Sequence, residues 1–207
     1  MKSAACYVPA VSTRGALGRP PVTTHAAIEE AAFALFEDRG FETTTMDDIA
    51  AAVGVGRRTL FRYYPSKNDI LWGQFDQGLA DFEKYFQQAP ASGPIATTIQ
   101  QAIIAFNRLP AAAVPQHRRR MTLLLSTPAL LGHSELRYAA WRDVIARFVA
   151  ERRGEHPTDT VPATAGRVSL ALSISAYEQW LRHPEHDLEQ LFHHVFDALG
   201  DTFALQQ

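Results

Sequence analysis

The sequence predicts an all-α fold of about nine helices in two parts, and three observations support this. Apolar residues recur at intervals of about three to four along most of the chain, the period of a helix with one buried face. Prolines and glycines, which end helices, separate these segments. No stretch shows a convincing strand-like alternation of apolar and polar residues. With 207 residues, 46% of them apolar, the chain can bury a substantial core.

Composition narrows the classes of function. The net charge of -2 excludes a uniformly basic nucleic-acid-binding protein, so any DNA contact must be confined to a local patch. A single cysteine, Cys6, excludes an internal disulfide framework and the usual zinc quartets, and fits a reducing cytoplasm. There is no apolar run of the roughly 18 residues that a membrane span needs. We therefore expect no membrane contact, no metal and no cofactor.

Residues 1 to 22 are predicted to form a disordered basic arm, because they contain three basic residues and no acidic one. The sequence leaves two readings of this arm open. It could be a solvated tail, or it could follow the phosphate backbone and place Arg19 in a minor groove.

The first two helices have recognisable ends. The first is predicted from Thr24 to Arg39, where alanine, leucine and glutamate favour a helix and Gly40 stops it. The second begins after Thr45, whose hydroxyl can cap it while Asp48 completes a capping box. Gly54 ends the second helix, because glycine takes a left-handed backbone without penalty.

The third helix follows a turn of three or four residues and ends before Pro65. Leu60 and Tyr64 lie one turn apart and should face inward. The outward positions are then Arg57, Arg58, Phe61 and Arg62. Residues 23 to 66 thus form a three-helix unit that is marginally stable alone. An Arg-rich second helix after a glycine-bounded turn is typical of a helix-turn-helix that enters a DNA groove, and the alternative is a helical hairpin with a solvated basic face.

The stretch FETTTMDDIAAAVGVGRRTLFRYYPSKNDIL resembles the TetR family of bacterial transcriptional regulators. The resemblance implies that Arg57 and Arg58 read bases, since guanidinium groups can pair bidentately with guanine. It implies phosphate contacts from Thr45, Thr59, Tyr63 and Lys67. Phe61 stands where the family more often has tyrosine, so it would meet a thymine methyl group instead, and Arg62 could reach either phosphate or base.

Residues 67 to 207 are predicted to form a larger helical domain for ligand binding and dimerisation. Its first helix is expected to run unbroken from Lys67 to Gln88 and, as the resemblance implies, to act as a lever on the DNA-binding unit. Further helices are expected near residues 95 to 108, 116 to 126, 134 to 153, 163 to 182 and 187 to 204. As the resemblance implies, the last two would form a homodimer interface, and reading two half-sites favours such a partner. The alternative is that the nearly all-apolar helix before the last one is a core helix of a monomer.

The larger domain contains candidates for a small-molecule cavity. Large apolar residues with a few polar tips are expected to line it: Phe82, Phe86, Ile103, Phe106, Met121, Leu125, Trp141, Ile145, Tyr177 and Trp180. Each of them could equally be an ordinary core residue. Three consecutive arginines at a helix start, Arg118, Arg119 and Arg120, oppose the helix dipole and could hold a ligand phosphate or carboxylate, or form a solvated basic turn.

Segments beyond the helix-turn-helix, including RMTLLLSTPAL and SAYEQWL, resemble the mycofactocin-associated subgroup of the TetR family. Together the resemblances imply a dimeric repressor that binds double-stranded operator DNA and responds to a small-molecule effector, with a long-chain acyl-CoA as one guess. The alternative is a helical small-molecule-binding protein, or an enzyme, without sequence-specific DNA binding. The enzyme has little support, because phosphate-binding glycine loops, nucleophile elbows and Cys-His pairs are missing from the sequence.

Overall fold

The computed structural model describes residues 23 to 203, apart from the side chains of Leu131 and Phe203, so the predicted arm of residues 1 to 22 lies outside it. Within this range the chain forms ten α-helices and two short 3₁₀ helices and no strand, which confirms the all-α prediction. The helices are α1 (His25–Arg39), α2 (Met46–Val53), α3 (Arg57–Tyr63), α4 (Lys67–Trp72), α5 (Phe75–Gln88), α6 (Ile95–Phe106), α7 (Val114–Ser126), α8 (Leu131–Arg153), α9 (Thr160–Arg182) and α10 (Leu188–Phe203). The 3₁₀ helices, Ala111–Ala113 and Pro128–Leu130, precede α7 and α8. None of the described helices is both long and apolar enough to cross a membrane.

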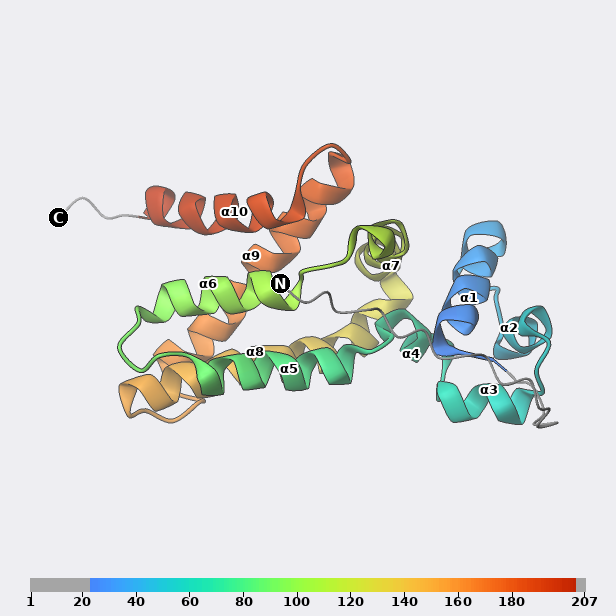
Figure 1. The fold of residues 1–207 in the computed structure, drawn as a ribbon, viewed down its shortest axis with the longest axis horizontal. Helices are drawn as coiled ribbons and strands as arrows, with labels where there is room; N and C mark the ends of the chain where they lie inside the picture. The colour runs from blue at the N-terminus through green and yellow to red at the C-terminus, as the bar shows by residue number, and fades with distance from the viewer. Residues whose placement is uncertain (1–22, 204–207) are drawn as a thin grey trace, which may run out of the picture.

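Helices α1 to α3 form a separate unit at one end of the molecule, with α4 between it and the larger helical bundle (Figure 1). The predicted local signals are present. The Thr45 hydroxyl and the Asp48 carboxylate form a complete capping box at the start of α2. Gly54 ends that helix in the left-handed conformation, with φ of 72°.

The helix is interrupted between α4 and α5, so the prediction of one continuous helix from Lys67 to Gln88 was wrong. Gly73 has a φ of +52°, a value that favours glycine, and its neighbour Gln74 is also outside both helices. A Cβ atom at Gly73 would lie 3.0 Å from Nη2 of Arg120 and 3.1 Å from Oε1 of Glu29. The apolar spacing continues through this point, which is why periodicity did not reveal the break.

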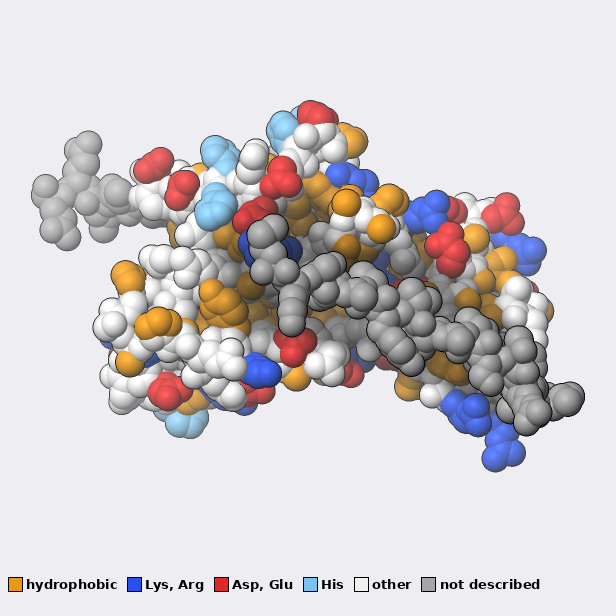
Figure 2. Space-filling view, viewed as in Figure 1, with side chains coloured by type: hydrophobic (Ala, Val, Ile, Leu, Met, Phe, Trp, Pro, Cys, Tyr) orange, Lys and Arg blue, Asp and Glu red, His pale blue; other side chains and the backbone are white. Residues whose placement is uncertain are grey.

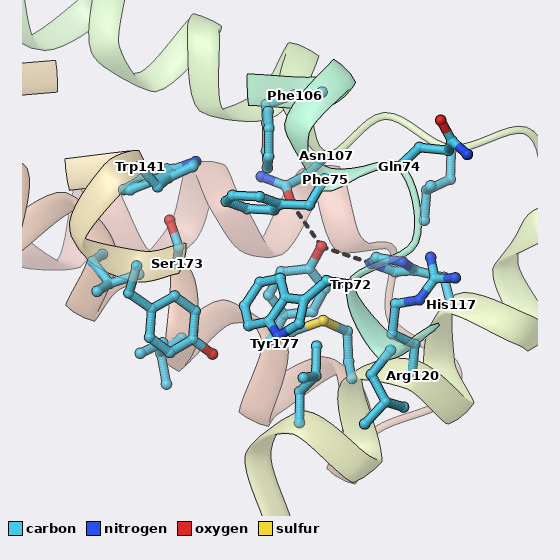
Figure 3. A pocket seen from close by; sticks show the side chains of 18 of the residues that line it. Trp72, Gln74, Phe75, Phe106, Asn107, His117, Arg120, Trp141, Ser173 and Tyr177 are labelled. Carbon is cyan, nitrogen blue, oxygen red and sulfur yellow. Dashed lines mark hydrogen bonds between the residues drawn. The ribbon is translucent and has the colours of Figure 1, made fainter. Parts of the chain in front are cut away.

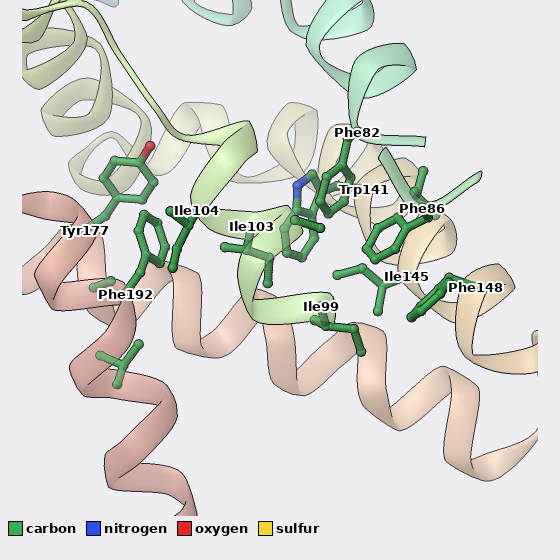
Figure 4. Packing of buried hydrophobic residues seen from close by; sticks show 14 of the residues in the cluster. Phe82, Phe86, Ile99, Ile103, Ile104, Trp141, Ile145, Phe148, Tyr177 and Phe192 are labelled. Atoms are coloured by element: carbon green, nitrogen blue, oxygen red, sulfur yellow. The ribbon is translucent and has the colours of Figure 1, made fainter. Parts of the chain in front are cut away.

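The larger bundle has an aromatic core between α5, α6, α8, α9 and α10 (Figure 4). Phe82 of α5 stacks on Trp141 of α8 with 5.2 Å between ring centroids, and Phe86 stacks on Phe148 at 4.5 Å. Such aromatic pairs stabilise a core by more than their buried area alone. The two stacked pairs thus join α5 to α8 across this core.

A second hydrophobic cluster extends across the junction. Its centre is the buried face of α1 to α4, including Ile28, Phe33 and Leu60. It also includes Leu124 of α7 and Leu130, which belong to the larger part of the chain. The three-helix unit is therefore stabilised partly by side chains from the bundle, as expected for a unit too small to bury a sufficient core.

Candidate DNA-binding surface and ligand cavity

Helix α3 presents its polar side chains to solvent as the sequence predicted. Leu60 and Tyr64 are buried, with 0% and 3% of their surface exposed. The exposed residues are Arg57, Arg58, Phe61 and Arg62. Figure 2 shows blue basic side chains at the lower right, where Figure 1 places α3. The surface thus offers cations on a helix narrow enough for the major groove.

Helix α2 holds one of these cations in place. Nη1 of Arg57 lies 3.1 Å from Oδ2 of Asp47, and its guanidinium lies 5.4 Å from the centre of the Phe61 ring. Both partners of the ion pair are largely exposed, so the pair contributes little to stability. Its effect is to limit the directions in which Arg57 can point.

Of the four residues that the family resemblance assigns to phosphate contacts, Thr45, Tyr63 and Lys67 form side-chain hydrogen bonds within the protein. Thr45 donates from its hydroxyl to Oδ2 of Asp48 at 2.6 Å, within the capping box. Tyr63 donates its phenolic proton to the carbonyl oxygen of Thr23 at 2.9 Å. Thr59 is half-buried. The two hydroxyl groups of Thr45 and Tyr63 therefore also order the backbone on which the surface is built.

Lys67 supports the turn between α1 and α2. Its Nζ donates to the carbonyl oxygens of Phe41 at 2.6 Å, Glu42 at 3.0 Å and Thr44 at 2.9 Å. The ammonium group also lies 4.6 Å from the Phe41 ring centre. Partial burial lowers the pKa of this lysine from its usual value. The sequence contained no local signal for this role, because the turn lies more than 20 residues before the lysine.

A cavity of about 440 Å³ lies between α4, α5, α7, α8 and α9 (Figure 3). Its described lining is mostly apolar and aromatic: Leu71, Trp72, Gln74, Phe75, Gln77, Gly78, Asp81, Phe106, Asn107, Leu109, His117, Arg120, Met121, Leu124, Tyr138, Trp141, Leu170, Ser173, Ile174 and Tyr177. This size and composition are typical of a small-molecule site.

Four of the ten residues expected at the cavity line it: Phe106, Met121, Trp141 and Tyr177. The other six belong to the packed core or lie against it: Phe82, Phe86, Ile103, Leu125, Ile145 and Trp180. They face the interior of the bundle, and helical periodicity cannot distinguish a core face from a cavity wall. Trp72, Phe75 and His117 also line the cavity but were not predicted from the sequence. The aromatic character of Trp72 and Phe75 was the one signal available for them.

A neutral hydrogen-bond chain forms one polar edge of the cavity. Tyr177 donates its phenolic proton to Oδ1 of Asn107 at 2.7 Å, and Nε2 of His117 lies 2.8 Å from the same phenolic oxygen. Nε2–H of His117 must then donate to the oxygen of Tyr177, because the phenolic proton of Tyr177 is already donated to Asn107. Burial, together with the charge of Arg120, lowers the pKa of His117 to about 4, so the ring is neutral near pH 7. Burial also raises the pKa of Tyr177.

The three consecutive arginines point in different directions. Arg118 stacks on Trp180 at 3.8 Å and donates to the carbonyl oxygen of that residue. Arg119 reaches α1, where it lies 3.5 Å from Glu30 and 3.1 Å from Glu37. Of the three, only Arg120 lines the cavity. The sequence could not show which arginine would face the cavity, because the direction of each depends on partners in α1 and α9.

Arg120 is part of a buried charged network that joins α7 to α1. Its Nη2 lies 2.6 Å from Oε2 of Glu29, and the two side chains are 19% and 11% exposed. Tyr64 donates to the other carboxylate oxygen of Glu29 at 2.7 Å, and Gln116 lies 3.4 Å from Oε2. This arrangement raises the pKa of Tyr64 through burial and through the adjacent Glu29 carboxylate. Among the described residues, Nε of Arg120 and Nε1 of Trp72 are buried without a hydrogen-bond partner.

Comparisons with known proteins agree with this arrangement. The family model described as bacterial regulatory proteins of the tetR family matches residues 28–71, and the model of the MftR C-terminal domain matches residues 93–204. The chain is 40% identical over 184 residues to the protein named as the mycofactocin biosynthesis transcriptional regulator MftR of Mycobacterium tuberculosis, across 89% of this chain and 93% of that protein. It is 31% identical over 159 residues to the transcriptional repressor LfrR of Mycolicibacterium smegmatis, across 75% of this chain and 78% of that protein.

Solved structures show the same fold. Thermus thermophilus FadR, a TetR family transcriptional repressor in complex with lauroyl-CoA, matches with a TM-score of 0.56 and 23% identity. The match covers 89% of this chain and 97% of that chain, and at this identity it shows the fold alone. The two sequence models together span the exposed arginines of α3 and most of the cavity wall. The chain belongs to the TetR family and is a DNA-binding transcriptional regulator.

Proposed function

We propose that the chain is a homodimeric repressor that leaves its operator when an apolar or acyl-CoA-type effector fills the cavity. The observation that carries this proposal is that one wall of the cavity is also the contact with the DNA-binding unit. Leu71 and Trp72 of α4 line the cavity and belong to the same hydrophobic cluster as the buried residues of α1 to α3. A ligand that displaces this wall would therefore move the unit that holds α3. The lauroyl-CoA bound by Thermus thermophilus FadR supports the acyl class.

The proposed division of the chain follows the contacts. Residues 23 to 66 would bind DNA, and residues 67 to 207 would bind the effector and the partner. Arg57 and Arg58 are the proposed base-reading residues, with Phe61 against a thymine methyl group. Phosphate contacts are proposed for Thr45, Thr59, Arg62 and Tyr63, while Lys67 would contribute its charge from behind the turn.

The proposed dimer interface is formed by α9 and α10. Four residues, Val168, Leu172, Ser175 and Gln179, share one face of α9 and are half-exposed. Helix α10 packs beside α9 and contributes the half-exposed Leu199. A partner that covers this face would fix the distance between two α3 helices, as paired half-sites require.

A binding titration tests the DNA-binding part of the proposal. Purified protein is titrated against its own upstream intergenic duplex and a scrambled duplex, at two salt concentrations, with and without lauroyl-CoA. We expect preference for the cognate duplex, a steep loss of affinity as salt rises, and weaker binding when lauroyl-CoA is present. If the protein prefers the cognate duplex and no bound effector changes this preference, the regulated mechanism is ruled out and DNA binding remains.

The variant Arg58→Ala makes the same titration specific to base reading. Losing a bidentate contact with guanine should cost about 1 to 3 kcal/mol on the cognate duplex and little on the scrambled one. Lys84→Ala, on the exposed surface of α5, is the matched control and should leave both affinities unchanged. Equal weakening on both duplexes would show that Arg58 touches phosphate only.

A further inference from the structure

Arg120 belongs to two sites at the same time. It lines the cavity, and its guanidinium is bonded to Glu29 of the DNA-binding unit. Figure 3 shows Arg120 at the cavity beside His117. A group bound in the cavity can therefore reach the cation that holds α1 against α7.

The charges around the cavity favour binding of an anionic group beside Arg120. Among the described residues of the lining, Arg120 is the one cation, because His117 is neutral near pH 7. Asp81 is the one acidic residue of this lining. The guanidinium can also donate a further hydrogen bond, because its buried Nε has no hydrogen-bond partner. A planar guanidinium binds carboxylate and phosphate oxygens most strongly through two parallel bonds.

Glu29 would be left in an unfavourable position if Arg120 turned away from it. The carboxylate is 11% exposed, and its other hydrogen bonds come from the neutral groups of Tyr64 and Gln116. A buried carboxylate without a cation is costly unless it becomes hydrated or protonated. There is little room nearby, because Gly73 lies against both partners of the ion pair. Hydration of Glu29 would require α1 or the Gly73 turn to move away from α7.

We propose that the anionic head group of an amphiphilic ligand takes the Arg120 guanidinium from Glu29, and that the buried Glu29 carboxylate, left without a cation, releases α1 from α7. This exchange rests on the proposed function and names the ligand class, an apolar body with a carboxylate or phosphate head. The apolar body lies among Phe75, Phe106 and Trp141. The apolar body provides most of the contact with the cavity, and the head group triggers the release of α1.

The adjacent Arg119 provides an internal comparison. It also pairs with glutamates of α1, but its side chain is 42% exposed and lies outside the cavity lining. Water can replace its partners at little cost. The exchange therefore predicts that Arg120, and not Arg119, transmits ligand binding to the DNA-binding unit.

The first test uses the unmodified protein and three probes that share one alkyl chain length: laurate, lauroyl-CoA and dodecanol. Binding is followed by the fluorescence of Trp72 and Trp141, which line the cavity, and operator release by fluorescence polarisation of a labelled duplex. We expect all three to bind, and only a probe with an anionic head to weaken operator affinity, by about tenfold. Release by laurate identifies the carboxylate, and release by lauroyl-CoA alone identifies the phosphates.

Two outcomes of this experiment would overturn the exchange. Release of the operator by dodecanol as efficiently as by laurate would show that filling the cavity is sufficient, and the ligand-responsive repressor would remain. Failure of every probe to bind would remove the ligand class. In both cases, binding of the cognate duplex without ligand is measured separately, so the DNA-binding function is judged independently.

Three substitutions test the residues themselves. Arg120→Gln should weaken laurate binding about tenfold or more and dodecanol binding little. Glu29→Gln keeps an acceptor for Tyr64 and removes the competitor for Arg120, so laurate should bind at least as tightly but release the operator far less. Arg119→Gln, the matched control, should behave as the unmodified protein. Full ligand-induced release by a folded Glu29→Gln protein, with its fold checked by circular dichroism and ligand-free operator binding, would refute the exchange.

Discussion

Two buried polar networks flank the same cavity and differ in charge. Glu29, Arg120 and Tyr64 form a charged network that joins two parts of the molecule. Asn107, Tyr177 and His117 form a neutral chain that stays within the larger bundle. In the charged network, a competing anion can replace Glu29 as the partner of Arg120. The neutral chain can be disrupted only by losing a donor or by gaining a proton. The difference separates a part that can respond to a ligand from a part that holds the cavity in shape.

The largest effect should come from leaving Glu29 without its cation. Arg120→Met should lower the free energy of unfolding by about 3 kcal/mol or more, because it breaks a mostly buried ion pair. Urea denaturation at neutral pH measures the loss. Replacing both partners, as Glu29→Leu with Arg120→Met, should restore most of it, since no unpaired charge remains. Arg119→Met should stay within about 0.5 kcal/mol of the unmodified protein, and equal losses for both arginines would remove the contrast.

Acid should disrupt the neutral chain through His117. The folded protein protonates this ring only near pH 4, while the unfolded chain does so near 6.5. The unfolded state therefore binds more protons in this window, so the contribution of His117 is complete above pH 6.5 and falls towards pH 4, by about 3 kcal/mol.

Urea denaturation across this pH range, with His117→Gln alongside, measures that contribution. The variant should show a flatter dependence, because glutamine can still donate to Tyr177 but does not titrate. His193→Gln, an exposed position on α10, is the control and should retain the slope. An unchanged slope in His117→Gln would show that other groups are responsible.

A change at Gly73 should weaken the junction without altering any charge. Gly73→Ala forces a side chain into a backbone conformation with φ of +52° and against Arg120 and Glu29. We expect a loss of about 1 to 3 kcal/mol in the free energy of unfolding and a changed operator affinity. Gly200→Ala, where an added methyl group meets nothing within 4 Å, should be neutral or stabilising. If Gly73→Ala were equally harmless, the turn would not be constrained.

The smallest effect should come from removing one hydroxyl group of the neutral chain. Tyr177→Phe leaves Oδ1 of Asn107 without its donor and Nε2 of His117 without its acceptor, which should cost about 1 to 2 kcal/mol in the free energy of unfolding. Ligand-induced release of the operator should persist, because the charged network is intact. Loss of release in a folded Tyr177→Phe protein would show that signalling passes through the neutral chain as well.

The accuracy of the sequence predictions depended on how local the deciding contacts were. The partners of the capping box, Thr45 and Asp48, lie three positions apart, so its chemistry is readable from the sequence. The break at Gly73 was not predicted, because the space at this residue is limited by Glu29 and Arg120, which are distant in the sequence. The same limit applies to the cavity. Arg120 meets Glu29 across 91 positions of the chain, and no local pattern predicts such a pair.

Lys67 has a consequence for the thermodynamics of DNA binding. Its three N–H groups already donate to the carbonyl oxygens of the turn before α2, so its side chain lost most of its rotational freedom during folding. A positive charge fixed in this way attracts phosphate without being ordered again when the duplex binds. In the proposed complex, the exposed Arg58 and Arg62 would still have to give up that freedom. The proposed surface thus combines one side chain that lost its rotational freedom on folding with others that would lose it only when the duplex binds.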